Sequence, residues 1–157
     1  MEFVLDNIDL QILQLMQDNG RVSNVDMAKK LEMAPSAVLE RVKKLEQKKV
    51  ILHYTTSVNP AAIGKKLLAF IFIHTADGFG SSATGVELAK IPEVLEVHNI
   101  AGEDCYLVKV RTADSAELMA LMRKEFAKIS TIQSTKTTIV LETVKEEQRL
   151  TIAIPKQ

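Results

Sequence analysis

Residues 33–46 read MAPSAVLERVKKLE, and this stretch predicts an amphipathic helix with one basic face. Pro35 suits the first position of a helix, because its fixed φ is helical and its missing N–H would have no partner there. One side of this helix is apolar, with a helical repeat of Val38, Val42 and Leu45. The other side carries Ala37, Arg41, Lys44 and Lys48.

Charge is unevenly distributed in this chain, although its formal net charge is zero. Residues 1–28 hold one basic and five acidic side chains, a net charge of −4. Residues 29–49 hold seven basic and three acidic side chains, a net charge of +4. A phosphate backbone responds to local charge, so the neutral total does not exclude nucleic acid as a partner.

Two shorter helices are predicted before this basic helix. In residues 6–20 apolar residues repeat with a helical period, Asp6 can cap the start, and Asn19-Gly20 is expected to end the helix in a left-handed conformation. Ser23 and Asp26 form a capping-box-like start for the second helix. Two helices joined by about three residues, the second with a basic outer face, predict a helix-turn-helix whose last helix could enter a major groove.

Two interpretations of the basic face are open. Such faces are usually only solvated, and Glu40 four residues before Lys44 is a common surface ion pair. Three short helices and a first turn of small residues favour DNA, because bulk at that turn would block groove entry. We expect the bases to be approached by Ser36, Ala37 and Glu40. The phosphates are expected to be contacted by Arg41, Lys44 and Lys48.

The periodicity changes after residue 51. Residues 51–59, ILHYTTSVN, predict a short strand, and residues 59–66, NPAAIGKK, predict a hinge. Two strand–helix–strand units follow, with helix starts expected at Thr84 and Asp114. The order βαββαβ predicts a ferredoxin-like sandwich, with both helices on one side of an antiparallel sheet.

The predicted fold class is therefore α+β, with two domains. The first is a winged-type helix-turn-helix domain over residues 1–58. A linker over residues 59–66 leads to the ferredoxin-like domain over residues 67–157. Within the second domain the run LLAFIFI, residues 67–73, is apolar on both strand faces. A second copy of the sheet is the simplest cover for the open face, so we expect a homodimer.

Composition limits the functional class further. The chain has 157 residues, 46% of them hydrophobic and 25% charged, as expected of a globular protein with a real core. Its longest apolar run is far shorter than the roughly 20 residues of a membrane span. The acidic N-terminus resembles no signal peptide, and a single cysteine fits a reducing compartment, so we expect a cytoplasmic protein without a membrane partner.

An enzyme is the rival class. A thiol or metal site would have to use Cys105 with His53, His74 or His98, but their spacing matches no metal-ligand motif. The sequence contains no phosphate-binding loop, no Gly-x-Ser-x-Gly and no His-Glu-x-x-His. We therefore expect no catalytic site, no metal and no cofactor.

Residues 5–54 resemble the DNA-binding domain of the Lrp/AsnC, or feast/famine, transcription regulators. The residues that fall in register with the family pattern include Leu5-Asp6, Asp9, Gly20-Arg21, Ala28, Pro35, Arg41-Val42, Leu45-Glu46, Val50-Ile51 and Tyr54. Two departures stand out: Ala34 replaces a capping Ser, and Lys49 replaces a Gly. Ser36 could compensate for the lost cap by shifting the helix start, and Lys49 would take a left-handed conformation at some cost.

The second half resembles the ligand-binding domain of the same family. Residues 101–110, AGEDCYLVKV, stand where the family has a Gly-x-x-Asp-Tyr-like loop. The resemblance implies a free amino-acid effector at subunit junctions, and dimers that assemble into tetramers or octamers. The implied effector residues are Gly102, Glu103, Asp104, Cys105 and Tyr106. Cys105 replaces the acidic residue before the Tyr, so an effector ammonium would depend on Glu103 or Asp104.

These observations predict a sequence-specific DNA-binding transcription regulator whose assembly and DNA binding respond to a small molecule, an amino acid by resemblance. Its partners would be double-stranded DNA, the small-molecule effector and further copies of itself. The alternative is an oligomeric small-molecule-binding or interaction protein with weakened DNA binding, which the departures at Ala34 and Lys49 leave open.

Overall fold

Two structural units, each with its own apolar core, make up the chain in the computed structural model, which describes residues 4–77, 81–102 and 105–155. One unit comprises residues 1–57 and 146–157, and the other comprises residues 58–145. None of the helices in the described ranges has the length and apolar character that crossing a bilayer requires.

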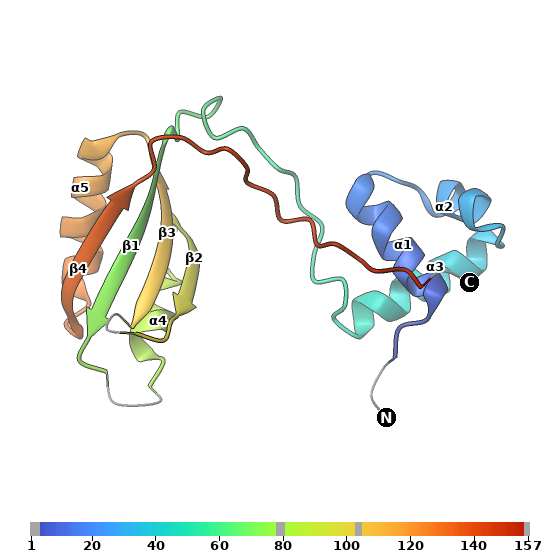
Figure 1. Ribbon diagram of the computed structural model, residues 1–157, viewed down its shortest axis with the longest axis horizontal. Coiled ribbons are helices and arrows are strands. Elements are labelled where there is room, and N and C mark those ends of the chain that lie inside the picture. Colours follow the sequence, from blue (N-terminus) through green and yellow to red (C-terminus); the bar gives the residue numbers. More distant parts are fainter. Residues whose placement is uncertain (1–3, 78–80, 103–104, 156–157) are drawn as a thin grey trace. The chain divides into compact units, whose positions relative to one another are not determined.

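Three helices form the first unit (Figure 1): α1 (Asn7–Asp18), α2 (Asn24–Leu31) and α3 (Pro35–Gln47). The capping predictions at the starts of α1 and α2 are confirmed. Asp6 caps α1 in a reciprocal capping box with Asp9. Ser23 caps α2 by accepting the N–H of Asp26.

The predicted left-handed end of α1 at Asn19-Gly20 is wrong. Asn19 is extended, with φ −147°, and Gly20 has no positive φ. The Asn19 side chain accepts the N–H of Arg21 at 3.0 Å, while its carbonyl accepts the N–H of Val22 at 2.9 Å. This side-chain turn reverses the chain without a left-handed residue.

Both family departures at α3 have visible structural consequences. Ala34 is the N-cap residue and makes no side-chain capping hydrogen bond, and the helix still begins at Pro35, so Ser36 does not shift the start. Lys49 has φ +57°, which confirms the left-handed conformation predicted for it. The helix thus forms without its cap because its apolar side is fully packed.

That packing builds the core of the first unit. The buried residues on α3 are those of the predicted apolar repeat, Val38, Val42 and Leu45. They meet Ile12 from α1 and Met27 and Ala28 from α2. Burying one side of α3 leaves its opposite side exposed.

The strand predicted over residues 51–59 is wrong. Residues 52–59 form neither helix nor strand, because no neighbouring strand of this unit pairs with them in the described chain. Tyr54 holds the segment to α3 instead, donating from its hydroxyl to Glu46 Oε1 at 2.8 Å. Partial burial and the Glu46 carboxylate raise the pKa of Tyr54 to about 12, so the phenol keeps its proton.

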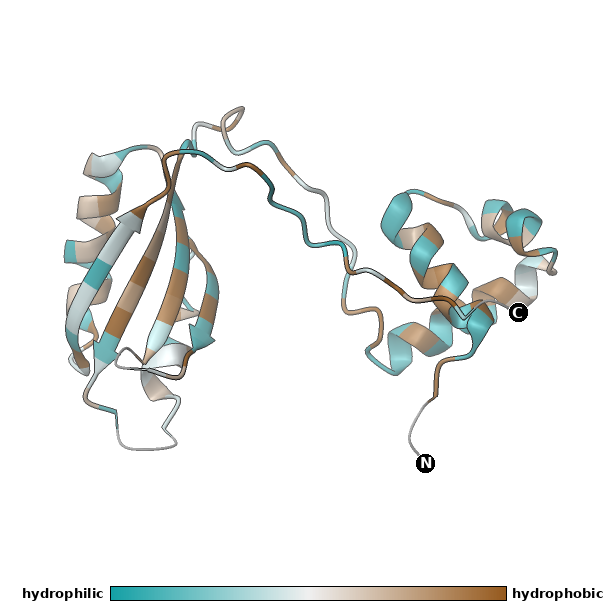
Figure 2. Cartoon of the chain, viewed as in Figure 1, coloured by the Kyte–Doolittle hydropathy of each residue, from teal (hydrophilic) through white to brown (hydrophobic). Residues whose placement is uncertain are grey.

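The second unit is a four-stranded antiparallel sheet with helices. Its elements are β1 (Leu67–Thr75), α4 (Ala83–Leu88), β2 (Val94–Asn99), β3 (Tyr106–Thr112), α5 (Ser115–Lys124), a 3₁₀ turn η1 (Phe126–Lys128) and β4 (Ile132–Ile139). The strand order β2-β3-β1-β4, with every neighbouring pair antiparallel, confirms the predicted βαββαβ ferredoxin-like arrangement. Figure 2 shows β1, the central apolar strand, as hydrophobic along most of its length.

One of the two helix starts predicted in this unit is correct. Asp114 caps α5 by accepting the N–H of Glu117 at 2.8 Å. Thr84 does not cap α4, because it lies inside that helix and Ser82 precedes it. Its hydroxyl lies 2.5 Å from the hydroxyl of Thr131, so a distant contact decides where this Thr sits.

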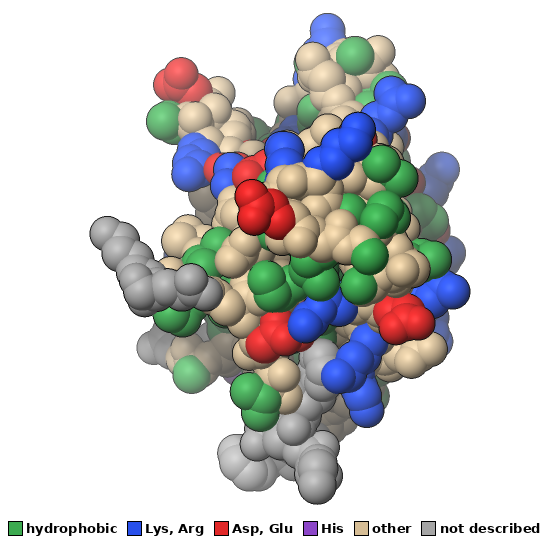
Figure 3. Space-filling view, turned by 90° about the vertical axis from the view of Figure 1, so that its right-hand side faces the viewer, with side chains coloured by type: hydrophobic (Ala, Val, Ile, Leu, Met, Phe, Trp, Pro, Cys, Tyr) green, Lys and Arg blue, Asp and Glu red, His purple; other side chains and the backbone are tan. Residues whose placement is uncertain are grey.

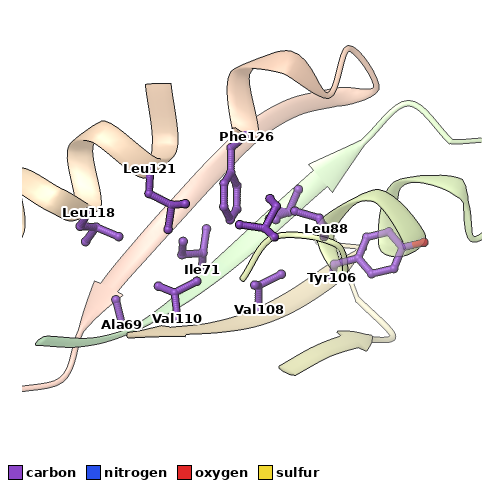
Figure 4. Close-up of a cluster of buried hydrophobic side chains, with 11 residues drawn as sticks. Ala69, Ile71, Leu88, Tyr106, Val108, Val110, Leu118, Leu121 and Phe126 are labelled. Carbon is purple, nitrogen blue, oxygen red and sulfur yellow. The ribbon is translucent and has the colours of Figure 1, made fainter. Parts of the chain in front are cut away.

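The core of the second unit lies between the helices and one sheet face (Figure 4). The strands contribute Ala69, Ile71, Ile73, Tyr106, Val108 and Val110, and the helical segments contribute Leu88, Leu118, Leu121 and Phe126. Phe70 and Phe72 of β1 alternate onto the opposite sheet face and are half-buried. The second apolar face expected of this strand is therefore present.

Gly85 of α4 allows the closest approach in this core. An added Cβ would lie 2.8 Å from Cε1 of Tyr106, whose side chain is 3% exposed. We predict that Gly85→Ala lowers the free energy of unfolding by about 1–3 kcal/mol, because the ring must move. Ala ordinarily stabilises a helix by about 1 kcal/mol relative to Gly. A net loss of stability in urea or thermal unfolding would therefore identify the clash with Tyr106.

Gly20→Ala is the matched control, since an added Cβ there meets nothing within 4 Å. A Gly85→Ala protein as stable as the wild type would show that the Tyr106 ring is not held against α4.

Candidate nucleic-acid interface and effector loop

The outward side of α3 carries the residues predicted to contact DNA. Those that are exposed are Ser36, Glu40, Lys44 and Lys48, and Ala37 is half-buried. In Figure 3, where the helical unit faces the viewer, Lys and Arg side chains are spread among apolar, uncharged and some acidic ones. Side chains with short stems occupy the first turn of α3 and lysines the last, which suits base approach at one end and phosphates at the other.

Arg41, which was predicted to contact a phosphate, makes two ionic contacts within the first unit. Its Nη1 lies 2.7 Å from Asp6 Oδ2 and 2.7 Å from Asp9 Oδ1. Its guanidinium therefore ties the middle of α3 to the start of α1 through two carboxylates. The sequence signal for this pairing was the acidic first helix beside a basic third helix.

The ionic cluster of Arg41, Asp6 and Asp9 shifts two pKa values. Partial burial works to raise the pKa of Asp6, but the Asp9 backbone N–H and Arg41 outweigh it and lower that pKa. Hydrogen bonds to Asp6 and Asp9 raise the pKa of Arg41. A carboxyl with a lowered folded-state pKa stabilises the fold above its unfolded pKa, and this contribution is lost as pH falls through the folded value.

We predict that Arg41→Gln lowers the stability of the helical unit by about 1–3 kcal/mol at neutral pH, because the Asp9 side chain, only 8% exposed, loses its cation. Asp6 is 52% exposed and contributes less. The variant should also lose part of the acid sensitivity that the lowered pKa of Asp6 predicts for the wild type below about pH 4.

Urea unfolding followed by helical circular dichroism at several pH values measures both effects. Lys43→Gln removes the same charge from an exposed position of α3 and is the control. Equal destabilisation by the two substitutions would mean that net charge, rather than the ionic cluster, sets the stability.

The predicted effector loop joins β2 to β3. Gly102 is exposed and has φ +143°, a conformation that other residues rarely adopt. Cys105 is half-buried, and its backbone donates to the Ile73 carbonyl at 2.9 Å and accepts from Ile100 at 3.0 Å. Glu103 and Asp104 lie outside the described residues. The loop is thus anchored through its backbone at Cys105, immediately before β3 begins.

Tyr106 lies in the core of the second unit. Its ring contacts α4 at Gly85, and its hydroxyl donates weakly to the Ser81 carbonyl at 3.4 Å. Since neighbouring strand residues point to opposite faces, the backbone fixes Tyr106 inward. The role of residues 102–106 in effector binding stays a prediction. Tyr106 contributes core packing next to this loop.

A cavity of about 670 Å³ lies on the helix side of the second unit. Its lining comes from α4, the turn after α4, and residues between the end of α5 and the start of β4. Two ion pairs contribute to that lining, Glu87 with Lys90 at 2.6 Å and Glu125 with Lys128 at 3.3 Å. No sequence pattern marks this cavity, because its walls are far apart in the chain.

The sequence offered Cys105 and the three histidines as the residues of a possible thiol or metal site. Within the described ranges no group of three His, Cys, Asp or Glu side chains could hold a metal ion. His98 instead lies 3.2 Å from Glu96, which also accepts from Lys109 at 3.1 Å. Burial works to raise the pKa of Glu96, but these two hydrogen bonds lower it.

Comparison with known families assigns both units. Residues 5–46 match the AsnC-type helix-turn-helix domain, and residues 68–150 match the Lrp/AsnC ligand-binding domain. The chain belongs to the Lrp/AsnC family. It is therefore a transcriptional regulator with a DNA-binding and a ligand-binding domain, not an enzyme.

Relatives of known name cover nearly the whole Lrp/AsnC chain. The leucine-responsive regulatory protein of Escherichia coli is 35% identical over 152 residues, 94% of this chain and 92% of that protein. The protein of the same name from Haemophilus influenzae is 34% identical over 150 residues, 94% of this chain and 90% of the relative.

Solved structures of Lrp/AsnC proteins share the fold. A transcriptional regulator of Neisseria meningitidis, solved in complex with L-Met, has a TM-score of 0.86 and 27% identity over 94% of this chain and 97% of that one. The leucine response regulatory protein of Mycobacterium tuberculosis has a TM-score of 0.84 and 31% identity over 95% of this chain and 100% of that one.

Proposed function

We propose that this Lrp/AsnC regulator binds double-stranded DNA as a homodimer through α3 and that a free amino acid modulates its assembly and DNA binding. The proposal of DNA binding is supported by the two sides of α3: one is apolar and fully packed, and the other is polar and exposed. We also propose that it acts in the cytoplasm of a prokaryotic cell, where its DNA would lie.

The proposed DNA contacts differ along α3. Ser36, Ala37 and Glu40 lie towards its N-terminal end, where a recognition helix approaches base edges. Lys44 and Lys48 lie towards its other end and would neutralise phosphates. Arg41 is left out of this proposal because Asp6 and Asp9 engage it.

The proposed dimer uses the sheet face that the helices of the second unit leave open. Phe70 and Phe72 lie there beside Leu107 of β3, in an antiparallel register of Phe70 with Lys109 and Phe72 with Leu107. Lys136 of β4 lies over the Phe72 ring at 5.6 Å. An apolar stripe bordered by charged side chains suits a matching copy, since a two-fold contact places the same stripe on both partners. Tetramers or octamers would follow from further contacts between dimers.

The proposed effector is a free amino acid bound at residues 102–106. Support for the ligand class comes from the Neisseria meningitidis relative, which was solved with L-Met. An α-ammonium group needs a carboxylate for a charge-assisted hydrogen bond, and Cys105 does not supply one. Glu103 or Asp104 would have to take that role, or binding would be weak.

We predict that Lys48→Ala weakens DNA binding to a similar extent on all sequences. The slope of log K against log salt should fall by about one unit per lost contact in each half-site, because fewer counterions are released. Titration of a labelled operator fragment at several salt concentrations, by fluorescence anisotropy, gives both quantities.

Lys124→Ala removes the same charge from an exposed position of α5 and is the control. An unchanged slope for Lys48→Ala would remove Lys48 from the interface. Wild-type binding that shows no preference for any promoter sequence would favour the alternative, an interaction protein with weakened DNA binding.

We predict that Cys105→Asp strengthens binding of a free amino acid by roughly 10- to 150-fold, the equivalent of about 1.5–3 kcal/mol for a hydrogen bond to a charged group. Titration calorimetry against a panel of amino acids that includes methionine and leucine measures the change. Cys105→Ser, of similar size but uncharged, is the control.

Thermal melts separate a binding effect from a folding effect, because Asp at a half-buried position can leave a carboxylate unpaired. Ordinary micromolar binding by the wild type, without improvement in Cys105→Asp, would reassign the ammonium partner to another residue of the loop.

A further inference from the structure

The C-terminal segment packs with the helical unit although it follows the last strand of the sheet unit. Residues 146–157 group with residues 1–57, whereas β4 ends at Ile139 in the other unit. Figure 1 shows the chain after β4 as a long trace without helix or strand. The first unit therefore contains a piece of chain that the helix-turn-helix prediction does not include.

One glutamine of α1 holds this segment by its backbone. Gln17 Nε2 donates to the Leu150 carbonyl at 3.0 Å, and Gln17 Oε1 accepts the Leu150 N–H at 2.8 Å. A side-chain amide carries a donor and an acceptor in one plane, so it can satisfy both backbone groups of one residue as a neighbouring strand would. This contact depends on the backbone at position 150 and not on the Leu side chain, which is 73% exposed.

Two further features fit the same contact. Arg149 Nη2 lies 2.5 Å from Asp18 Oδ1, next to Gln17 at the end of α1. Both side chains are nearly half exposed, so this pair orients the segment more than it stabilises it. Beyond Leu150, Ile152 is half-buried while Thr151 and Ala153 are exposed.

We propose that the end of α1, at Gln17 and Asp18, is a docking surface for the chain's own C-terminal segment, residues 149–155. The docked segment makes a second tether between the two units. One connection runs through the linker before β1, and the other runs from β4 through residues 140–148 to α1. Two tethers confine the helical unit more than one, since closing the second connection removes conformations that a single linker allows.

The first test is hydrogen exchange in the full chain. Gln17→Met keeps the length and helix propensity of the side chain but removes both hydrogen bonds. Loss of one to two ordinary hydrogen bonds should raise the exchange rate of the Leu150 amide by about 5- to 30-fold. Gln11→Met, the same substitution elsewhere on α1, should leave that rate unchanged. Equal rates in the wild type and both variants would overturn the docking surface.

A second variant keeps the test independent of the folding of α1. Leu150→Pro removes the N–H that Gln17 accepts, in a segment outside both cores. The side-chain amide resonances of Gln17 should then shift towards those of a solvated glutamine. Thr151→Pro is the control, because proline keeps the preceding residue extended. Equal shifts from both substitutions, or no shift from Leu150→Pro, would overturn the docking surface.

Isotope mixing identifies the chain that supplies the segment. In the Arg149→Lys variant, a carbodiimide should join the introduced amine to the Asp18 carboxylate by an amide bond. The carbodiimide takes up the elements of the water that this condensation removes and becomes its urea. In a mixture of ¹⁴N and ¹⁵N protein, allowed to exchange subunits, cross-linked peptides should carry one label only. Mixed-label peptides would overturn the assignment to the chain's own segment.

The rotational motion of the helical unit tests whether the docked segment acts as a tether. The correlation time of the helical unit, from ¹⁵N relaxation, should shorten in Gln17→Met and stay unchanged in Gln11→Met. An unchanged value in Gln17→Met, despite faster Leu150 exchange, would show that docking does not confine the helical unit.

Discussion

The ion pair of Arg41 with two carboxylates determines which side of the recognition helix is available. Asp6 and Asp9 belong to the capping box of α1, so the groups that start the first helix also hold the third. Val42, the residue after Arg41, is buried in the core. Rotation of α3 about its own axis would therefore disturb the ionic contact of Arg41 and the apolar packing of Val42. The exposed polar side is thereby fixed, and it is the side that the proposed DNA contacts require.

Local side-chain chemistry was readable from the sequence, and contacts at long range were not. The caps at Asp6, Ser23 and Asp114 were predicted correctly, because each acts on a backbone group three residues away. The cap at Thr84 failed because its hydroxyl has a partner at Thr131, on the other side of α5 in the sequence. The expected strand over residues 51–59 failed because a strand needs a neighbour, and a residue pattern cannot supply one.

The effector loop shows the same division. The sequence located the loop between two strands, and Tyr106, the first residue of β3, is buried in the core against which the half-buried Cys105 packs. What the pattern could not reveal is that Tyr106 depends on Gly85 of α4 for its space. A loop residue that looked like a ligand contact is thus also a packing residue, and substitutions at Tyr106 would perturb the fold and the proposed site together.

A neutral chain can still present a basic helix because the acidic residues at and in its first helix are paired with arginines of the same unit. Asp6 and Asp9 face Arg41, and Asp18 faces Arg149 from the C-terminal segment. The carboxylates of the acidic first helix are thus held beside cations of the same unit, and their fields largely cancel at a distance. The lysines at the far end of α3 contribute to the field that approaching DNA meets. The distribution of charge among contacts, rather than its sum over 157 residues, therefore decides whether this chain attracts a phosphate backbone.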